Sequence, residues 1–222
     1  MRKGFTLAEV LITLGIIGVV AALTLPTLIE KHREQVTVAK VKKFYSTINQ
    51  ALQFAINENG TIDQWNYAEA NKQSNKFFDY FRPYLKITKD CGSKSGCIGD
   101  GVYSTLNNSS SMNYDTHPSY YKVILNDGSF MWLRQNMPSS ANFNGSCSEA
   151  DWGYSNSCGG IWIDVNGKAK PNVIGRDTFA FAILKDKIVP MNYNTDCKLN
   201  GKGWSCSNYI LLNSNMNYLR EN

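Results

Sequence analysis

The sequence is poor in the residues and motifs on which most enzyme sites depend. Among its 222 residues it has only two histidines, His32 and His117. It contains no Gly-x-Ser-x-Gly motif, no glycine-rich phosphate loop and no Cys-x-x-Cys pair. These absences remove the usual signatures of serine hydrolases, nucleotide-binding enzymes and zinc sites. We therefore predict that the protein is not an enzyme.

Charge is also scarce. Charged residues make up 18% of the chain, and the formal net charge is +5. The one concentration of Lys and Arg lies between Lys31 and Lys43, where it is more typical of a solvated helix face than of a polyanion-binding surface. Arginine is sparse, which argues against a nucleic-acid platform of stacked aromatics flanked by arginine. The apolar content of 43% is enough for a real core.

Cysteine is missing from the first third of the chain. Its six cysteines form three close pairs in the sequence: Cys91 and Cys97, Cys147 and Cys158, Cys197 and Cys206. An even number of paired cysteines indicates disulfides made in an oxidising compartment. Six cysteines allow 15 different connectivities, so the sequence does not determine the pairing. Bonds between the neighbours, 91–97, 147–158 and 197–206, are our expectation.

The first segment is a long apolar run that carries one acid. From Phe5 to Leu25 almost every residue is apolar or small, which is long enough for a helix to cross a hydrocarbon core of about 30 Å. Because Arg2 and Lys3 precede the run, the N-terminus should face the cytoplasm and the rest of the chain the outside. The run is longer than the apolar region of a secretory signal peptide. A plain membrane anchor fits the length but does not explain Glu9, since a carboxylate in a membrane helix is costly.

The residues around this acid resemble the leader of type IV pilins and type II secretion pseudopilins. The stretch KGFTLAEVL carries the likeness, and Pro26 matches the proline that closes the apolar run in that family. The resemblance implies that a prepilin peptidase cuts after Gly4 on the cytoplasmic side and methylates the new N-terminus, Phe5. It also implies that Glu9 sets the register between subunits in a filament.

Elementary electrostatics gives a reason for this role of Glu9. After cleavage Phe5 carries a positively charged amine, and the Glu9 carboxylate of a neighbouring subunit can neutralise it in apolar surroundings, where an unpaired charge is heavily penalised. A pair within one chain also fits, because residues four apart share a helix face. The resemblance favours the intermolecular pair. Small residues in the same run would let helices approach closely; they are Gly15, Gly18, Ala21 and Ala22.

The chain after Pro26 predicts a second, amphipathic part of the same helix. Pro26 removes one backbone donor, so a kink is expected there. Apolar residues then recur at three- and four-residue steps from Val41 to Ile56, and Asn59-Gly60 is a good helix stop. The segment that follows, to about residue 87, looks helical for much of its length, with several aromatics as likely core: Phe77, Phe78, Tyr80 and Phe81.

The rest of the chain predicts a small antiparallel sheet. YKVILNDGSFMWL is typical of a hairpin in which Val123 and Leu125 alternate against Phe130 and Trp132 across an Asn-Asp-Gly turn. Further strands are expected at 161–165 and within 178–190, with surface loops at 107–114 and 136–160. The end of the chain, CSNYILLNSNMNYL, looks like a closing strand or helix.

The predicted fold is therefore α+β and pilin-like: a long N-terminal helix, with a membrane-spanning first half, packed on an antiparallel head. The expected divisions are a leader over 1–4, a transmembrane and polymerisation helix over 5–25, its amphipathic continuation over 26–59, and a disulfide-bonded periplasmic or extracellular head over 60–222.

One loop of the head has two interpretations. WIDVNGKAKPNVIGRDTFAF resembles a segment common in pseudopilin-like proteins, and in some relatives the loop before the last strands binds calcium. Asp164, Asn166, Asn172 and Asp177 can supply the oxygen ligands that Ca²⁺ prefers, although the loop is not an EF-hand. The alternative, which we favour, is a tight turn at Asn166 and a strand capped or bridged by Asp177.

Two functions fit the whole sequence. The first is a prepilin or pseudopilin-like structural subunit, held in the bacterial inner membrane and then assembled into a pilus or pseudopilus. Its implied partners are prepilin peptidase, other pilin subunits, the assembly platform and the lipid bilayer, and the long cysteine-tied head favours a minor subunit. The second is a filament-tip or membrane-tethered binding module, which aromatics near glycine-rich loops would suit, although such residues are more often core. They are Trp152, Tyr154, Trp162 and Trp204.

Overall fold

A computed structural model describes residues 4, 6–65, 73–135, 147, 149–151, 153–193 and 196–220. The chain divides into two compact units, Met1–Val36 and Thr37–Asn222. The first unit holds the start of a long helix, and the second holds the end of that helix together with the head.

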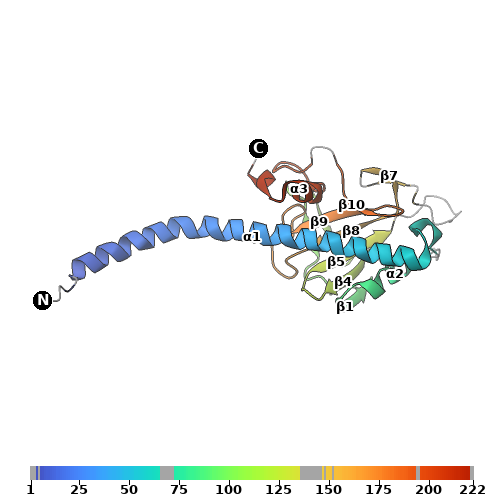
Figure 1. The fold of residues 1–222 in the computed structure, drawn as a ribbon, viewed down its shortest axis with the longest axis horizontal. Coiled ribbons are helices and arrows are strands. Elements are labelled where there is room, and N and C mark those ends of the chain that lie inside the picture. Colours follow the sequence, from blue (N-terminus) through green and yellow to red (C-terminus); the bar gives the residue numbers. More distant parts are fainter. Residues whose placement is uncertain are drawn as a thin grey trace. The chain divides into compact units, whose positions relative to one another are not determined.

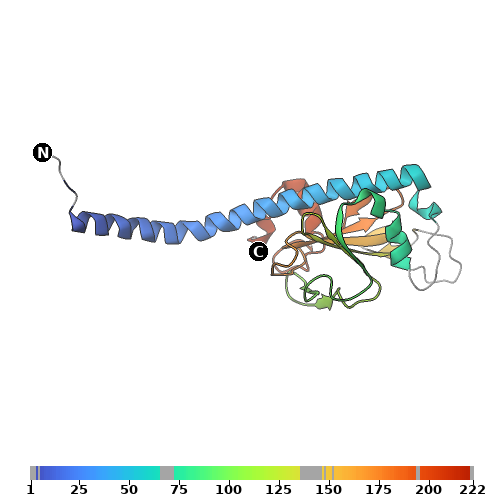
Figure 2. The same ribbon diagram turned by 90° about the horizontal axis from the view of Figure 1, so that it is seen from below.

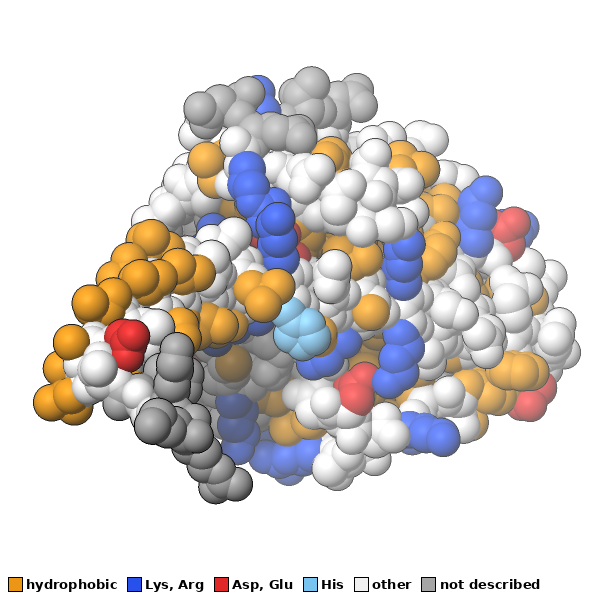
Figure 3. Space-filling view, turned by 60° about the vertical axis from the view of Figure 1, so that its left-hand side comes forward, with side chains coloured by type: hydrophobic (Ala, Val, Ile, Leu, Met, Phe, Trp, Pro, Cys, Tyr) orange, Lys and Arg blue, Asp and Glu red, His pale blue; other side chains and the backbone are white. Residues whose placement is uncertain are grey.

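Helix α1 runs from Leu7 to Asn59. In the first unit its apolar side chains are exposed, and Figure 3 shows them gathered on this part of the helix. Within the described part of the chain, α1 is the one helix long and apolar enough to cross a membrane. Pro26 lies inside α1, and a kink there stays a prediction. The helix ends where the sequence predicted, because Gly60 follows with a φ of 76° and donates its N–H to the Ile56 carbonyl at 2.8 Å.

The second unit begins with the amphipathic part of α1. Its buried residues recur at steps of three and four and form one stripe along the helix, as expected for a helix that packs on a core. They are Val38, Val41, Phe44, Ile48, Ala51, Leu52 and Ala55. This stripe belongs to the same buried cluster as one face of the sheet, and Figures 1 and 2 show this part of α1 lying along that face.

The main sheet has six strands in the order β1-β4-β5-β8-β9-β10, and every neighbouring pair is antiparallel. The strands are β1 Ile87–Gly92, β4 Tyr121–Leu125, β5 Phe130–Gln135, β8 Gly159–Asp164, β9 Thr178–Ile183 and β10 Ile188–Pro190. The remaining helices are η1 Ile62–Gln64, α2 Gln73–Asp79, η2 Arg82–Tyr84, α3 Cys206–Asn213 and η3 Asn217–Leu219. A long helix packed on an antiparallel sheet confirms the predicted α+β, pilin-like fold.

The predicted hairpin is present as β4 and β5, but its apolar side chains lie on both faces of the sheet. Val123 pairs with Met131 and both lie in the cluster that contains α1, whereas Phe130 and Trp132 lie in a second cluster. The sheet is thus buried on both faces. Even Lys122 is fully buried, with its Nζ 3.3 Å from the Tyr120 carbonyl oxygen.

Loops and two small sheets cover the second face. Strand β2, Val102–Ser104, pairs with β3, Ser111–Asn113, and β6, Glu149–Asp151, pairs with β7, Tyr154–Ser157. Strands β3, β6 and β7 fall in segments that the sequence predicted as surface loops, so that prediction was wrong there. These strands are short and mostly polar, and they lack the hydrophobic alternation by which a strand is recognised.

Three disulfides tie the head together. They join Cys91 to Cys97, Cys147 to Cys158 and Cys197 to Cys206, the pairing expected from the sequence. The first closes a loop that is also organised by Asp115, which is only 5% exposed. The Asp115 carboxylate accepts the N–H groups of Gly96, Cys97 and Ile98. Burial alone would raise the pKa of this carboxyl, but the three donors outweigh it and lower the pKa.

Candidate processing and assembly site

The start of α1 is closed by a capping box. Thr6 precedes the first helical residue, Leu7, and Glu9 is the third helical residue. The Glu9 Oε2 accepts hydrogen bonds from both the backbone N–H and the hydroxyl of Thr6, each at 2.8 Å. In return the Glu9 N–H donates to the Thr6 Oγ1 at 3.3 Å. Each side chain therefore satisfies a backbone N–H at the helix start that has no partner within the helix.

Thr6 is a residue of this site that the sequence analysis did not identify. The signal was available, because Thr6 and Glu9 have the T-x-x-E spacing of a capping box just before an apolar run. Gly4 is exposed two residues before Thr6. Phe5, the expected new N-terminus, lies outside the described residues. The site thus places an acid one helical turn from the predicted cleavage point.

The helix that follows is suited to apolar surroundings. The hydroxyls of Thr13 and Thr24 donate to the carbonyls of Glu9 and Val20, both at 2.9 Å, so neither hydroxyl depends on water for a partner. A Cβ atom added to Gly15 or Gly18 would meet no other atom within 4 Å. Within the described part of the chain, nothing requires glycine at these positions, and close contacts between helices remain a prediction for them.

The four residues of the alternative calcium site lie together at the ends of β8 and β9. The Asp164 Oδ1 accepts the N–H groups of Asn166 and Gly167, both at 3.0 Å, and its Oδ2 accepts the Tyr103 hydroxyl at 2.7 Å. A side chain at Gly167 would collide with the Gly128 carbonyl, because its Cβ would lie 2.3 Å from that oxygen. This is the tight Asn-Gly turn of the favoured interpretation.

Asp177 anchors the other side of this loop. Its Oδ2 accepts the Asn172 N–H at 2.8 Å and the Asn166 amide at 3.0 Å, and its Oδ1 accepts the Val173 N–H at 2.7 Å. Two buried side-chain oxygens remain without a hydrogen-bond partner, Asn166 Oδ1 and Asn172 Oδ1. Ca²⁺ takes six to eight oxygen ligands, so its binding would require the carboxylates to exchange several of these bonds. The calcium site stays a prediction.

Burial makes the two carboxyls of this loop weaker acids than usual, because it raises their pKa values. Asp164 is fully buried, and burial together with the nearby Asp177 raises its pKa to about 7 despite the hydrogen bonds from Tyr103, Asn166 and Gly167. Burial also raises the pKa of Asp177. The loop therefore tends to hold a proton that an unfolded chain would release.

The aromatic residues singled out in the sequence have different environments. Trp162 is buried in the second cluster. Tyr154 is half-buried and donates its hydroxyl to the Pro190 carbonyl at 2.9 Å, and Trp152 lies outside the described residues. Trp204 packs partly against the second cluster and also lines a surface pocket. Of the three that the structure describes, Trp204 is the one that lines a pocket.

Comparison with known families divides the chain into two adjoining matches. A model of the prokaryotic N-terminal methylation motif matches residues 1–25. A second model, described as a family of unknown function (DUF6613), matches residues 27–222. No curated protein and no solved structure matches the chain.

Proposed function

Since this chain belongs to the family of unknown function DUF6613 and carries a type IV pilin-like methylation leader, we propose that it is a minor subunit of a type IV pilus or a type II secretion pseudopilus. The leader supports a pilin-like or pseudopilin subunit and implies processing by prepilin peptidase and assembly with other pilins. The observation that carries the proposal is the capped acid beside the cleavage point, followed by an exposed apolar helix that ends on an antiparallel head.

The expected processing changes the charge at the start of α1. Cleavage after Gly4 leaves a positive amine on Phe5, directly before the residue that caps the helix. A positive charge at a helix N-terminus is unfavourable, because the backbone N–H groups already make that end positive. Glu9 supplies the compensating negative charge within the first turn.

Assembly then depends on whether the Glu9 carboxylate binds the Phe5 amine of its own chain or that of a neighbouring chain. In the single chain the carboxylate is bonded to Thr6, which keeps it hydrogen-bonded before assembly. In a filament of helices packed side by side, the Phe5 amine of a neighbouring copy is the stronger partner, because the interaction between opposite charges in a dry core exceeds that between a carboxylate and a hydroxyl. Only one stagger of neighbouring helices brings the two charges together, so the pair sets the register.

We also propose where the subunit lies before assembly and how it is oriented in the membrane. Before assembly the apolar part of α1 lies in the inner membrane with its N-terminus in the cytoplasm and the head outside, where an assembly platform recruits it. The oxidising side of the membrane is where the three disulfides of the head would form. A structural role needs no catalytic site, and the described residues contain no group of three or more His, Cys, Asp or Glu that could hold a metal.

Intact-mass spectrometry on sheared filaments tests the proposal. We expect the mature chain to begin at Phe5 with one added methyl group and to be scarce relative to a major subunit. A strain without the peptidase is the control and should retain the whole leader in its membranes. Mature protein that still carries Met1 would overturn the proposal, and a chain that forms the bulk of the filament would overturn its minor position.

A further inference from the structure

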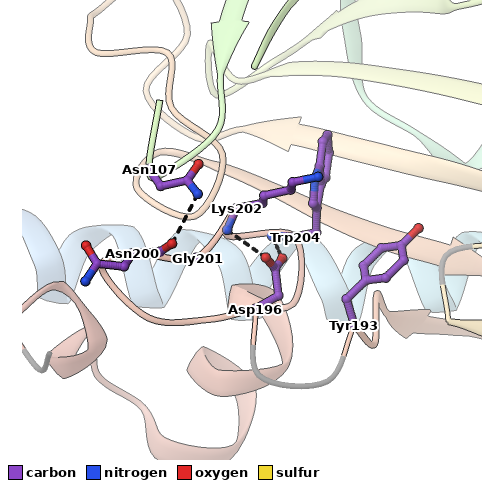
Figure 4. A pocket seen from close by; sticks show the side chains of 7 residues that line it. All are labelled: Asn107, Tyr193, Asp196, Asn200, Gly201, Lys202 and Trp204. Atoms are coloured by element: carbon purple, nitrogen blue, oxygen red, sulfur yellow. Dashed lines mark hydrogen bonds between the residues drawn. The ribbon is translucent and has the colours of Figure 1, made fainter. Parts of the chain in front are cut away.

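A surface pocket of about 490 Å³ lies between the β2–β3 turn and the loop that precedes α3. Its side chains include two aromatics, two amides, one carboxylate and one amine: Tyr193, Trp204, Asn107, Asn200, Asp196 and Lys202. Figure 4 shows Asn107 and Asn200 on one side, Tyr193 on the other and Asp196 between them. None of these groups takes part in the processing and assembly site.

Residues 196–206, on one side of this pocket, are held together by several contacts. The Asp196 carboxylate accepts the N–H groups of Lys202, at 2.7 Å, and Trp204, and the Cys197–Cys206 disulfide closes the same loop. Gly201 is packed so closely that a Cβ atom there would lie 2.0 Å from the Asp196 carbonyl oxygen. A ligand would therefore meet a preformed surface and would lose little free energy by ordering it.

A second set of bonds fixes the pocket to the β2–β3 turn. The N–H groups of Leu106 and Asn107 donate to the carbonyls of Lys202 and Gly201, both at 3.0 Å. The Asn107 amide donates to the Asn200 carbonyl at 3.1 Å. The Asn107 Oδ1 also accepts the Thr105 hydroxyl and the Ser109 N–H, both at 3.1 Å, so this side chain organises the turn. Trp204 rests against the second core cluster.

The chemistry of the lining narrows the class of ligand. Tyr193 is 37% exposed and Trp204 is half-buried, so the pocket offers aromatic surface. A hydrocarbon ligand would remove the surrounding amides from water without giving them partners. A nucleic-acid strand is bound through several phosphate contacts, and Lys202 is the single cationic side chain among the described residues that line the pocket.

A pyranose ring has both an apolar face for the aromatic side chains and polar groups for the amides of this lining. One of its faces is made largely of C–H groups, which pack on aromatic rings, and its rim carries hydroxyls that both donate and accept hydrogen bonds. Side-chain amides match such hydroxyls because they also carry donors and acceptors. The volume lies at the lower end of the range of small-molecule sites and is sufficient for one or two sugar rings.

We propose that this pocket is a saccharide site, in which Trp204 and Tyr193 contact the apolar face of a pyranose ring and Asn200 and Lys202 bind its hydroxyl or acidic groups. Binding of a glycan by the head would be a function separate from filament assembly. It does not depend on the subunit's place in a filament.

Titration of the full-length mature chain, kept in a detergent without sugar groups, tests this site. The probes are lactose, N-acetyllactosamine and sialyllactose, followed by tryptophan fluorescence and calorimetry. We expect saturable binding of at least one probe that weakens about tenfold in Asn200→Ala, since about two hydrogen bonds to the ligand are lost. Trp204→Ala should abolish binding, and Trp204→Phe should restore part of it by keeping an aromatic face.

The controls separate binding from folding. Trp204 supports the core, so the exposed Asn200→Ala and Lys202→Ala variants carry the test if Trp204→Ala does not fold. Phe54→Ala removes an exposed aromatic side chain on α1, away from the pocket lining, and should bind as the parent does. Lys202→Ala should weaken the binding of sialyllactose more than that of lactose if the natural glycan is acidic. If the natural glycan is neutral, it should weaken the binding of both probes equally. No binding of any probe would overturn the proposal, and so would binding by both Asn200→Ala and Lys202→Ala that is as tight as that of the parent.

Discussion

The Glu9 carboxylate lies 2.8 Å from both the backbone nitrogen and the hydroxyl of Thr6. The acid at the centre of the proposed assembly step is therefore already hydrogen-bonded in the single chain. A neighbouring amine must displace or share these bonds when it joins Glu9. Assembly is thus an exchange of partners, and this makes the local and the intermolecular roles of Glu9 separable by mutation.

Glu9→Val should be cleaved and methylated normally but should not enter filaments, because no carboxylate remains to neutralise a neighbour's amine. The measurement is the ratio of mature protein in the sheared and membrane fractions, with the N-terminus checked by mass spectrometry. Glu30→Gln, which changes an exposed acid elsewhere on α1, is the matched control and should assemble. Normal assembly of Glu9→Val would contradict the register role.

Thr6→Ala distinguishes the two roles of Glu9. It removes the cap, which weakens the helix start by about 1 kcal/mol, but it leaves the carboxylate free to meet another chain. We expect assembly close to that of the parent. A defect as severe as that of Glu9→Val would show that the bond within one chain is the function of the acid.

Gly4→Val should accumulate as an uncut precursor held in the membrane, because the peptidase is expected to cut after the glycine of the leader. An immunoblot that resolves precursor from mature chain measures the effect. Gly15→Ala changes a glycine within α1 whose added Cβ would meet no atom of the described residues within 4 Å, so its precursor should be cut as efficiently as the parent. Cleavage of Gly4→Val would place the processing point elsewhere.

Asp164 should make the head more stable in mild acid. Its pKa is about 7 in the fold and near 4 in an unfolded chain, so the folded state holds a proton that the unfolded state has lost. The resulting stability is complete below pH 4 and disappears as the pH rises through 7; the pKa difference corresponds to about 4 kcal/mol. The raised pKa of Asp177 acts in the same direction.

Urea unfolding of the purified chain between pH 4 and 8, in EDTA, measures this dependence. Asp164→Asn imitates the protonated side chain and should flatten the fall in stability across that window. Asp186→Asn, at an exposed turn, should leave it unchanged. An Asp164→Asn profile with the parent's slope would show that Asp164 is ionised in the fold.

Thermal unfolding with added Ca²⁺ distinguishes the two interpretations of the 164–177 loop. Because Asp164 and Asp177 already use their oxygens to hold the turn, we expect millimolar Ca²⁺ to leave the thermal unfolding temperature of the EDTA-treated chain unchanged. Mg²⁺ is the matched control cation. A rise produced by Ca²⁺ alone, and lost in Asp177→Asn, would instead establish a calcium site with Asn166 and Asn172 as further ligands.

The sequence predicted best where one segment is sufficient to define an element. The apolar run, its acid and the stop at Asn59-Gly60 are local patterns, and α1 follows them. The β4–β5 hairpin is local as well, because its turn lies between its strands. The disulfides also join near neighbours in the chain. Each of these features depends on residues less than about a dozen positions apart or on a continuous helical period.

Features that depend on distant segments were not visible in the sequence. Lys122 is buried because loops from elsewhere in the chain cover its face of the sheet, and the residues of its own strand do not report that cover. The saccharide pocket combines Asn107 with Trp204 through backbone bonds between two distant loops. No pattern of spacing reports such a contact, since loops are placed by packing rather than by period.

Helix α1 contains no cysteine, so each disulfide closes a loop within the head. What fastens α1 to the sheet is side-chain packing, with polar bonds such as those from Lys40 to the Val165 carbonyl at 2.6 Å and from the Ile188 N–H to Asn49 at 3.0 Å. Tension on a filament would enter each subunit through this helix. The head would then separate from the helix along the helix–sheet contact before any covalent crosslink carried load.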